Sequence, residues 1–495
     1  MKKILLEKNV VRGFSLAILL LGIISIQVFA IPESDIVFKA MKDEMNRSIK
    51  KLKMENLQKP YYVAYYVVEG ESTKISASFG SLESEQFLPF RHAQADVRIG
   101  DYTFDNANFA SDSWEGYSMK GDWYISFEND YDSLRFALWS LTDESYKQAL
   151  DRFSKKKAFV EAKNITEMYD DMSKEKPVET FLPVSMEKVD LPVWRNNIKE
   201  LSMIFKQYPD VKHSNITFNF QSCVVRFLNT EGFAFKQPCS NGEIEIQAET
   251  YATDGFRLSG RTGKKFSELK NAPTKETLLK EVRELAEKVS QMAHSKTINT
   301  YIGPVLFEKD AAGKLFEQLF VQNVSFPREI WSPDGVYRRP GELVSRLGLR
   351  VLSPFLSVTD NPFERSYDGI PLMGYYEVDD EGVPAEKLTL VERGKLLNLY
   401  MSRAPIKEFK NSNGHARTGM FECPQGGPGN VFITPDKNSP KVMAHDKLKK
   451  KLIEISRELE LEYGIIIRGF ENFRSPFTAY KVNVRDGKEE PVHGI

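Results

Sequence analysis

The order of apolar and polar residues divides the chain into two parts of different character. In residues 31–300, long helical patterns alternate with groups of short strands. Apolar residues that recur every three or four positions predict amphipathic helices, and alternating or β-branched and aromatic runs predict strands. We expect a mixed α/β domain here. Its predicted helices are 36–57, 131–162, 194–208 and 275–294, and its predicted strands are 61–68, 72–79, 93–102, 215–220, 223–228, 233–237, 243–252 and 255–260.

The pattern changes after Gly303, where short apolar segments are separated by Pro, Gly, Asp and Asn. Such punctuation is typical of a β-rich domain with long loops. Within it we expect a short helix at 311–322, a longer helix at 446–462 and a strand at 464–470. The fold class is therefore α+β, with a mixed α/β N-terminal domain (31–300) followed by a β-rich C-terminal domain (301–495).

The first thirty residues have the pattern of a targeting segment. Basic residues between Lys2 and Arg12 precede an apolar run over 14–29, which ends in small residues up to Ala30. This combination is typical of a secretory signal peptide. The run is marginal for a membrane span, which needs about 20 apolar residues. We expect cleavage after residue 30 and export to the periplasm or the extracellular space, with no membrane span left. An uncleaved membrane anchor is the alternative.

Charge and cysteine content change two further expectations. A net charge of −1 and a pI near 6.7 give no electrostatic reason to expect nucleic acid. Cys223 and Cys239 flank a predicted hairpin and would pair in an oxidising compartment, which would leave Cys423 over. The alternative is that all three are buried thiols. No CxxC pair or Cys/His cluster indicates structural zinc.

The histidines argue against a metallopeptidase centre of the usual kind. The chain has six, and the closest two are about thirty residues apart, so no helix can present two on adjacent turns. HExxH and the longer HExxxH are both absent. Helix 311–322 carries Glu317, with Phe316 before it and Val321 after it. Because a metal needs several N, O or S ligands, we interpret it as a packing helix and predict no metal, no cofactor and no catalytic residue.

Residues 379–382, Asp-Asp-Glu-Gly, place three acids beside a glycine. They would serve as a carboxylate pair or a cation loop, but a calcium loop needs about six spaced oxygens, which we do not find. We interpret the segment as a solvated tight turn between strands 372–378 and 387–391, with Gly382 at positive φ. Asp380 and Glu381 are retained as candidate peptide contacts.

Residues 412–417, Ser-Asn-Gly-His-Ala-Arg, form the best polar cluster. Asn-Gly favours a turn, and His415 and Arg417 would share one face of an extended segment. A His–Arg pair in a cleft can bind a peptide carbonyl or carboxylate. Equally, the side chains of the loop would satisfy backbone groups, and the sequence favours neither interpretation. Asn413, His415 and Arg417 are our peptide-binding candidates.

Several segments, in a fixed order, carry a family resemblance. They are 98–102 with Asp105-Asn106, 303–307 leading into helix 311–322, 379–384, 394–396, 401–403, 412–417, 428–430 and 486–490. Each is weak alone, but their order and spacing are specific, and together they resemble the TldD/PmbA family of metallopeptidase-related proteins. The resemblance covers most of the chain beyond residue 30.

The resemblance implies a two-domain protein that forms a homo- or hetero-dimer with a related subunit, often one metal-bearing and one metal-free. The active type carries a histidine–glutamate motif on the helix that corresponds to 311–322, has a further cysteine ligand near its C-terminus, and cleaves unfolded peptides lying extended in a cleft. Phe316 and Val321 make this chain similar to the metal-free type. The family also continues beyond the segment resembled by 486–495, so we expect a short C-terminal end.

Three hypotheses follow from the sequence. The first is an exported, non-catalytic protein that pairs with a related subunit or binds unfolded peptide segments. The second is an active metallopeptidase that holds zinc through a non-standard set, such as Glu317, His415 and an acid from 379–381. The third is a structural or interaction protein that retains only the fold.

Overall fold

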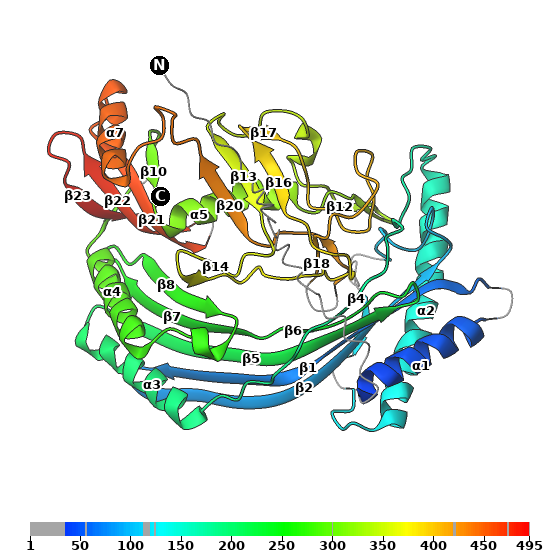
Figure 1. The fold of residues 1–495 in the computed structure, drawn as a ribbon. Helices are drawn as coiled ribbons and strands as arrows, with labels where there is room; N and C mark the ends of the chain where they lie inside the picture. The colour runs from blue at the N-terminus through cyan, green and yellow to red at the C-terminus, as the bar shows by residue number, and fades with distance from the viewer. Residues whose placement is uncertain are drawn as a thin grey trace, which may run out of the picture.

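The computed structural model describes residues 35–494, apart from 55–56, 112–118, 123–124, 299, 419–421 and 473–474. The predicted signal peptide, residues 1–30, lies outside the described residues, so its cleavage stays a prediction. Within the described ranges, no helix is long and apolar enough to cross a membrane. The fold is α+β, as predicted, with the later strands lying over a large curved sheet (Figure 1).

The N-terminal part is built on one eight-stranded sheet. Its strands are β1 (Pro60–Ser78), β2 (Ser81–Ile99), β3 (Lys120–Asp122), β4 (Glu179–Phe181), β5 (His213–Asn229), β6 (Ala234–Pro238), β7 (Asn241–Tyr251) and β8 (Arg257–Phe266). The order is β3-β2-β1-β5-β6-β4, and β7 pairs with β5 and β8. The strand β5 pairs with β1 along one edge, and along the other edge its first half pairs with β7 and its second half with β6.

Two pairs of predicted strands are single long strands in the structure. Segments 61–68 and 72–79 both belong to β1, and 215–220 and 223–228 both belong to β5. The glycine at the apparent break, Gly70, marks a close approach instead of a turn. A Cβ on Gly70 would stand 2.2 Å from the Ser222 carbonyl oxygen, so glycine lets β5 pair alongside β1.

Helices cover the two ends of this sheet. They are α1 (Ile36–Lys51), α2 (Tyr131–Ala162), α3 (Leu191–Met203) with the 3₁₀ turn η1 (Ile204–Gln207), and, after η2 (Leu269–Asn271), α4 (Lys275–Ala293). One apolar core joins α3 and α4 to the sheet, and a second joins α1 and α2 to it. The prediction of α2 was correct to the residue; its first turn is capped by Asp130, which accepts from Ser133 N.

The first half of β1 is buried on both faces. Val63, Tyr65 and Val67 point into the core under α1 and α2, whereas Tyr62, Ala64 and Tyr66 belong to a further core shared with the C-terminal part. This arrangement explains the continuous apolar run 61–68, because a strand covered on both sides needs no polar alternation.

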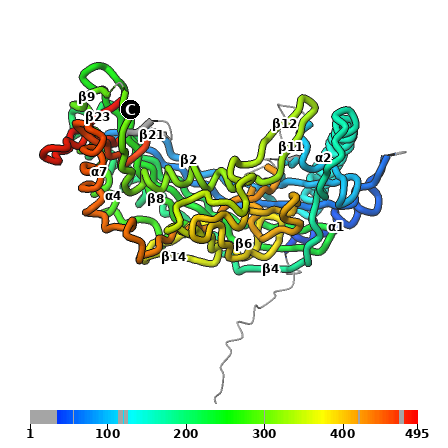
Figure 2. Tube along the Cα trace, turned by 90° about the horizontal axis from the view of Figure 1, so that it is seen from above, coloured from blue at the N-terminus to red at the C-terminus, as the bar shows by residue number. Residues whose placement is uncertain are grey.

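The C-terminal part consists of small sheets and short helices. The main sheets are β17-β16-β13-β20 and β10-β21-β22-β23-β9. Figure 2 shows the chain elongated, with α2 at one end and α7 and β23 at the other. The strands are β9 (Lys296–Thr297), β10 (Val305–Phe307), β11 (Ile330–Ser332), β12 (Gly335–Arg338), β13 (Leu356–Asp360), β14 (Ser366–Tyr367), β15 (Ile370–Pro371), β16 (Leu388–Glu392), β17 (Lys395–Leu396), β18 (Ala416–Arg417), β19 (Gln425–Gly426), β20 (Val431–Pro435), β21 (Tyr463–Asn472), β22 (Ser475–Asn483) and β23 (Glu489–His493).

Two predictions for this part need correction. Segment 372–378 forms no strand and contributes only an isolated bridge from Val378 to Pro384. The single helix predicted at 311–322 is three joined turns, α5 (Asp310–Phe316), a π-turn η3 (Glu317–Val321) and α6 (Gln322–Val324). The remaining helices are the 3₁₀ turn η4 (Val344–Arg346) and α7 (His445–Glu458). The last strand, β23, is paired on both sides, by β22 and β9.

Candidate functional site

The acidic segment 379–382 forms the predicted turn, but inside the protein. Asp379 is fully buried and Glu381 is 7% exposed. Gly382 has a φ of 82°, and a Cβ there would stand 3.2 Å from Phe233 of the N-terminal part. The prediction of a solvated turn is therefore wrong, because the turn packs against the large sheet instead of facing water.

Asp379 stabilises this turn with both carboxylate oxygens. Its Oδ1 accepts from the backbone N–H groups of Glu381 and Val383, both at 2.9 Å, and its Oδ2 accepts from Ala416 N at 3.0 Å. Burial raises the pKa of Asp379 well above its ordinary value and the Glu381 charge adds to this, although the three N–H donors oppose it. The carboxylate thus ties the turn to β18.

The two neighbouring acids are also committed to internal contacts. The Glu381 carboxylate accepts from Arg403 N at 2.6 Å, and burial raises the pKa of Glu381 to about 7 against the opposing charge of Arg403. Asp380 accepts from Thr418 N at 2.8 Å, and burial raises its pKa although Arg417 opposes the shift. The Tyr66 hydroxyl of β1 donates to the Asp380 carbonyl oxygen.

Arg403 connects this turn to the N-terminal part. Its guanidinium is fully buried and donates to both carboxylate oxygens of Glu231, in the turn between β5 and β6, with one N–O distance of 2.8 Å. It also donates to the carbonyl oxygen of Ser173, with N–O distances of 2.5 and 3.2 Å. The polar centre of the molecule is thus a junction between two parts of the chain.

Segment 412–417 lies beside this junction. Asn413 Oδ1 accepts from Met401 N and its Nδ2 donates to Leu399 O, both at 2.9 Å. His415 is fully buried, and its Nδ1 lies 2.9 Å from the Asn413 carbonyl oxygen. Asn413 and His415 therefore satisfy groups inside the fold. Peptide binding through them stays a prediction that would require the loop to move.

Arg417 is the candidate that reaches solvent. Its side chain is 37% exposed, pairs with Asp380 at 3.4 Å and lies over the Tyr376 ring at 4.3 Å. The five predicted peptide-binding residues are thus in one region, because Asp379 joins the acidic turn to Ala416. The Arg417 side chain is more exposed than those of Asp380, Glu381 and His415.

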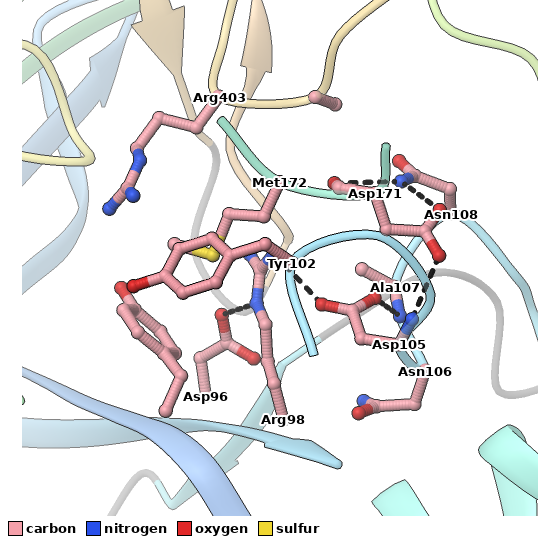
Figure 3. Close-up of polar contacts among 12 residues, drawn as sticks. Asp96, Arg98, Tyr102, Asp105, Asn106, Ala107, Asn108, Asp171, Met172 and Arg403 are labelled. Carbon is pink, nitrogen blue, oxygen red and sulfur yellow. Dashed lines mark hydrogen bonds and ion pairs between the residues drawn. The ribbon is translucent and has the colours of Figure 1, made fainter. Parts of the chain in front are cut away.

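Sequence reasoning missed a second polar cluster, in the N-terminal part; Figure 3 shows its members Asp105, Ala107 and Asp171. Lys156 of α2 is fully buried and donates to Asp171 Oδ2 at 2.5 Å and to the carbonyl oxygens of Asp105 and Ala107. Burial raises the pKa of Asp105 to about 6, against the nearby Arg98 charge. The available signal was Lys156 itself, which falls on the apolar side of the helix that also carries Ala149.

Arg328 links this second cluster to the C-terminal part. Its Nη2 lies 3.1 Å from Asp171 Oδ1, and its Nη1 donates to Pro405 O at 2.5 Å. Both clusters therefore join the two parts of the chain, because in each a buried cationic side chain contacts groups from both parts. Their full satisfaction indicates a structural role.

The helix that would carry a family metal motif does not fit zinc. Phe316 stacks on Phe320 with ring centroids 4.9 Å apart, and Val321 is buried in the same apolar core. Glu317 is half exposed and pairs with Lys314 at 2.8 Å. Across the described residues, no three His, Cys, Asp or Glu side chains are grouped so that they could hold a metal ion. The set Glu317, His415 and an acid from 379–381 is not brought together as a site.

The structure brings Cys223 and Cys239 together, with their Cα atoms 5.1 Å apart. This separation is within the range that a disulfide spans. Cys223 lies on β5, and Cys239 directly follows β6, so a bridge would close the hairpin between them. The sequence alone left both this pairing and three buried thiols open.

Comparison with known proteins relates the C-terminal half to one family. Residues 300–479 match the family described as the PmbA/TldA metallopeptidase C-terminal domain. A curated protein from Archaeoglobus fulgidus, described as a metalloprotease, is 31% identical over 100 residues, which are 20% of this chain and 22% of that protein. The chain thus matches only about a fifth of that relative's length.

Solved structures extend the likeness to almost the whole chain. A protein from Thermotoga maritima, described as a proposed modulator of a DNA gyrase, has a TM-score of 0.58 at 16% identity, with 92% of this chain and 90% of that one covered. TldE from Thermococcus kodakarensis has a TM-score of 0.55 at 14% identity, with the same coverage of both chains. At this level of identity, these likenesses show the fold alone.

Proposed function

We propose that this chain, which belongs to the TldD/PmbA family of metallopeptidase-related proteins, is an exported, non-catalytic subunit that binds unfolded peptide segments beside a related, metal-bearing subunit. The membership is carried by the C-terminal match. Export is proposed from the pattern of residues 1–30, and the partner and the peptide from the family resemblance.

The apolar surface of α5 and η3 is the observation that carries the non-catalytic assignment. Phe316 and Val321 stand at the two histidine positions of an HExxxH motif, and both are packed into a core with residues such as Leu396 and Tyr400. Carbon atoms cannot ligate a cation, and Glu317 alone is one ligand of the three or four that zinc needs. A chain with this helix has no means of activating water in the family's manner.

Peptide binding is supported by the chemistry around Arg417. A guanidinium that is partly exposed above an aromatic ring can donate to a peptide carbonyl or carboxylate while its stem stays fixed. Its neighbour Asp380 offers an acceptor beside it. An extended segment with an acidic side chain or a C-terminal carboxylate is the peptide chemistry that suits this site.

Metal content and cleavage test the assignment directly. The purified chain should contain less than a tenth of an equivalent of zinc and should leave an unfolded peptide substrate intact, with or without added zinc. The matched control is a family member that carries HExxxH, purified in the same way. Stoichiometric zinc that is lost to a chelator together with cleavage would establish the active-metallopeptidase alternative.

Partner capture separates the non-catalytic subunit from the third hypothesis. The chain should co-purify from its native host with a histidine-bearing relative in a fixed ratio, and binding of an unfolded peptide should be measurable by fluorescence anisotropy. A chain that neither pairs with such a relative nor binds peptide would instead be a structural or interaction protein that retains only the fold. Recovery of the mature chain, beginning after Ala30, outside the cytoplasm tests export.

A further inference from the structure

A cavity of about 670 Å³ is lined by residues of β9, β22 and β23, with Tyr463 of β21 and His294 at the end of α4. Figure 1 shows β22 and β23 beside α4 and α7, whereas β18, which carries Arg417, lies elsewhere in the C-terminal part. The volume falls within the ~300–1,000 Å³ that is typical of small-molecule sites. None of the five candidate peptide-binding residues lines the cavity, so a ligand here would be independent of the proposed function.

Three charged side chains line the cavity without an ion-pair partner. They are Lys481 of β22, Glu490 of β23 and Lys296 of β9, and none forms an ion pair with another residue in the described ranges. Lys481 and Glu490 stand directly opposite each other in the ladder, where Cβ atoms are about 5 Å apart and opposite charges can pair. The Lys481 ammonium instead lies over the Tyr463 ring, 4.3 Å from its centroid. Both charges are thus left to groups other than each other.

The opposite face of the same strands has its charges paired. Successive residues of a strand point to opposite faces of a sheet, so Glu489 faces away from the cavity that Glu490 lines. The Glu489 carboxylate accepts from Lys449 Nζ at 2.7 Å and from Arg468 Nη1 at 2.8 Å. Charge on that face is therefore satisfied within the fold, whereas the cavity face leaves its charges to water or to a ligand.

The order of the charges indicates the chemistry of the ligand. The strand β23 lies between β22 and β9, so Glu490 comes from the strand between those of the two lysines. Positive, negative and positive groups in this order are complementary to a ligand with negative, positive and negative groups. An acidic amino acid has that order, because its ammonium group lies between the α-carboxylate and the side-chain carboxylate. Each of its charged groups can form a charge-assisted hydrogen bond with a side chain of opposite sign.

We propose that this cavity binds an acidic amino acid, or a dipeptide that begins with one. The two carboxylates bind Lys296 and Lys481, and the ammonium group binds Glu490. The buried side chains of Ile298 and Val492 also line the cavity and provide an apolar surface for the aliphatic part of the ligand. The Tyr463 ring holds the Lys481 ammonium in place by a cation–π contact, which reduces the ordering that ligand binding requires.

Isothermal titration calorimetry with the whole protein tests the proposal. L-Glutamate should bind with a Kd of about 1 mM or below. L-Glutamine lacks the side-chain carboxylate and N-acetyl-L-glutamate lacks the ammonium group, so each should bind about fivefold more weakly or worse. Glutamyl-alanine distinguishes the two sources: binding as tight as that of L-glutamate would assign the dipeptide, and weaker binding the free amino acid. Equal affinity for L-glutamate, L-glutamine and N-acetyl-L-glutamate would overturn the proposal.

Substitutions in the cavity separate recognition from an effect on folding. Glu490→Gln should remove the preference for L-glutamate over N-acetyl-L-glutamate, whereas a general loss of structure would weaken both ligands together. Lys481→Gln, and independently Lys296→Gln, should weaken the binding of both ligands about fivefold or more. Lys488→Gln lies between β22 and β23 but outside the cavity; it is the matched control and should bind as the wild type does. A preference that Glu490→Gln leaves unchanged, or wild-type protein that does not bind L-glutamate, would contradict the assignment.

Discussion

Arg403 and Glu231 form a buried ion pair that joins the C-terminal part to the turn between β5 and β6. The Arg403 side chain is 0% exposed and that of Glu231 is 14% exposed. The free-energy cost of burying the Arg403 charge is offset by two hydrogen bonds to the Glu231 carboxylate and two to the Ser173 carbonyl oxygen. The two parts are thus held by charge as well as by the apolar core that Tyr66 and Val378 share.

Replacing Arg403 should be strongly destabilising. The variant Arg403→Met would leave Glu231 without its cationic partner in a largely buried position, and breaking a buried pair in this way costs about 3–5 kcal/mol. Urea unfolding at pH 7 measures the loss. Lys147→Met on α2 breaks an exposed pair with Asp143 and should cost less than about 0.5 kcal/mol. Equal effects of the two changes would contradict the assigned role of Arg403.

The acidic turn should give stability an unusual dependence on pH. Burial raises the pKa of Glu381 to about 7 from its ordinary 4.5, so the folded chain holds a proton that the unfolded chain releases between these values. The free energy of unfolding should therefore fall as pH rises from about 5 to 7, by at most about 1.4 kcal/mol per pH unit. The variant Glu381→Gln should show a smaller fall, because its amide oxygen can still accept from Arg403 N without a proton, and the fall that remains comes from groups such as Asp105, whose pKa burial also raises.

The measurement is urea unfolding of both proteins at several pH values in this window. Glu317→Gln, on the half-exposed carboxylate of η3, is the matched control and should follow the wild type. A constant difference between wild type and Glu381→Gln across the window would show that the buried carboxylate does not take up the proton.

Local pattern was enough to predict some elements and not others. The helix α2 could be predicted to the residue because its apolar spacing and its Asp130 cap are local features. The edge half of β2, over Ser81 to Phe90, could not, since its exposed residues show no apolar alternation. Gly70 looked like a break because only the position of β5 shows why glycine is needed there.

The residues of the candidate site were predicted from the sequence, but their burial inside the protein was not. The spacing of 379–382 predicts the turn, and Gly382 has the expected positive φ. The burial of this turn depends on residues more than a hundred positions away, such as Phe233 beside Gly382, and no local pattern reports these. Likewise, nothing near His415 in sequence indicates that Asp360 lies opposite its ring.

His415 and Arg417 should respond differently to substitution by alanine. His415→Ala removes a fully buried ring that contacts Tyr400 and should cost about 2–4 kcal/mol of stability. Arg417→Ala removes a partly exposed side chain, so it should cost less than His415→Ala but weaken binding of an unfolded peptide at least fivefold. Thermal unfolding and fluorescence anisotropy separate the two effects. Equal losses of stability with unchanged peptide affinity would assign both residues to loop packing.

Cys223 and Cys239 should be joined by a disulfide in protein isolated from an oxidising compartment. Closing a loop of this length, with a sequence separation of 16 residues, should contribute about 3 kcal/mol to stability. Peptide mapping without reduction should therefore recover the peptide with Cys223 linked to the peptide with Cys239, and Cys239→Ser should lower stability by about that amount. The same variant compared under reducing conditions is the control, because the difference should then nearly disappear. Recovery of both peptides unlinked from protein isolated outside the cytoplasm would contradict the pairing. It would also remove a structural feature that favours an oxidising compartment independently of residues 1–30.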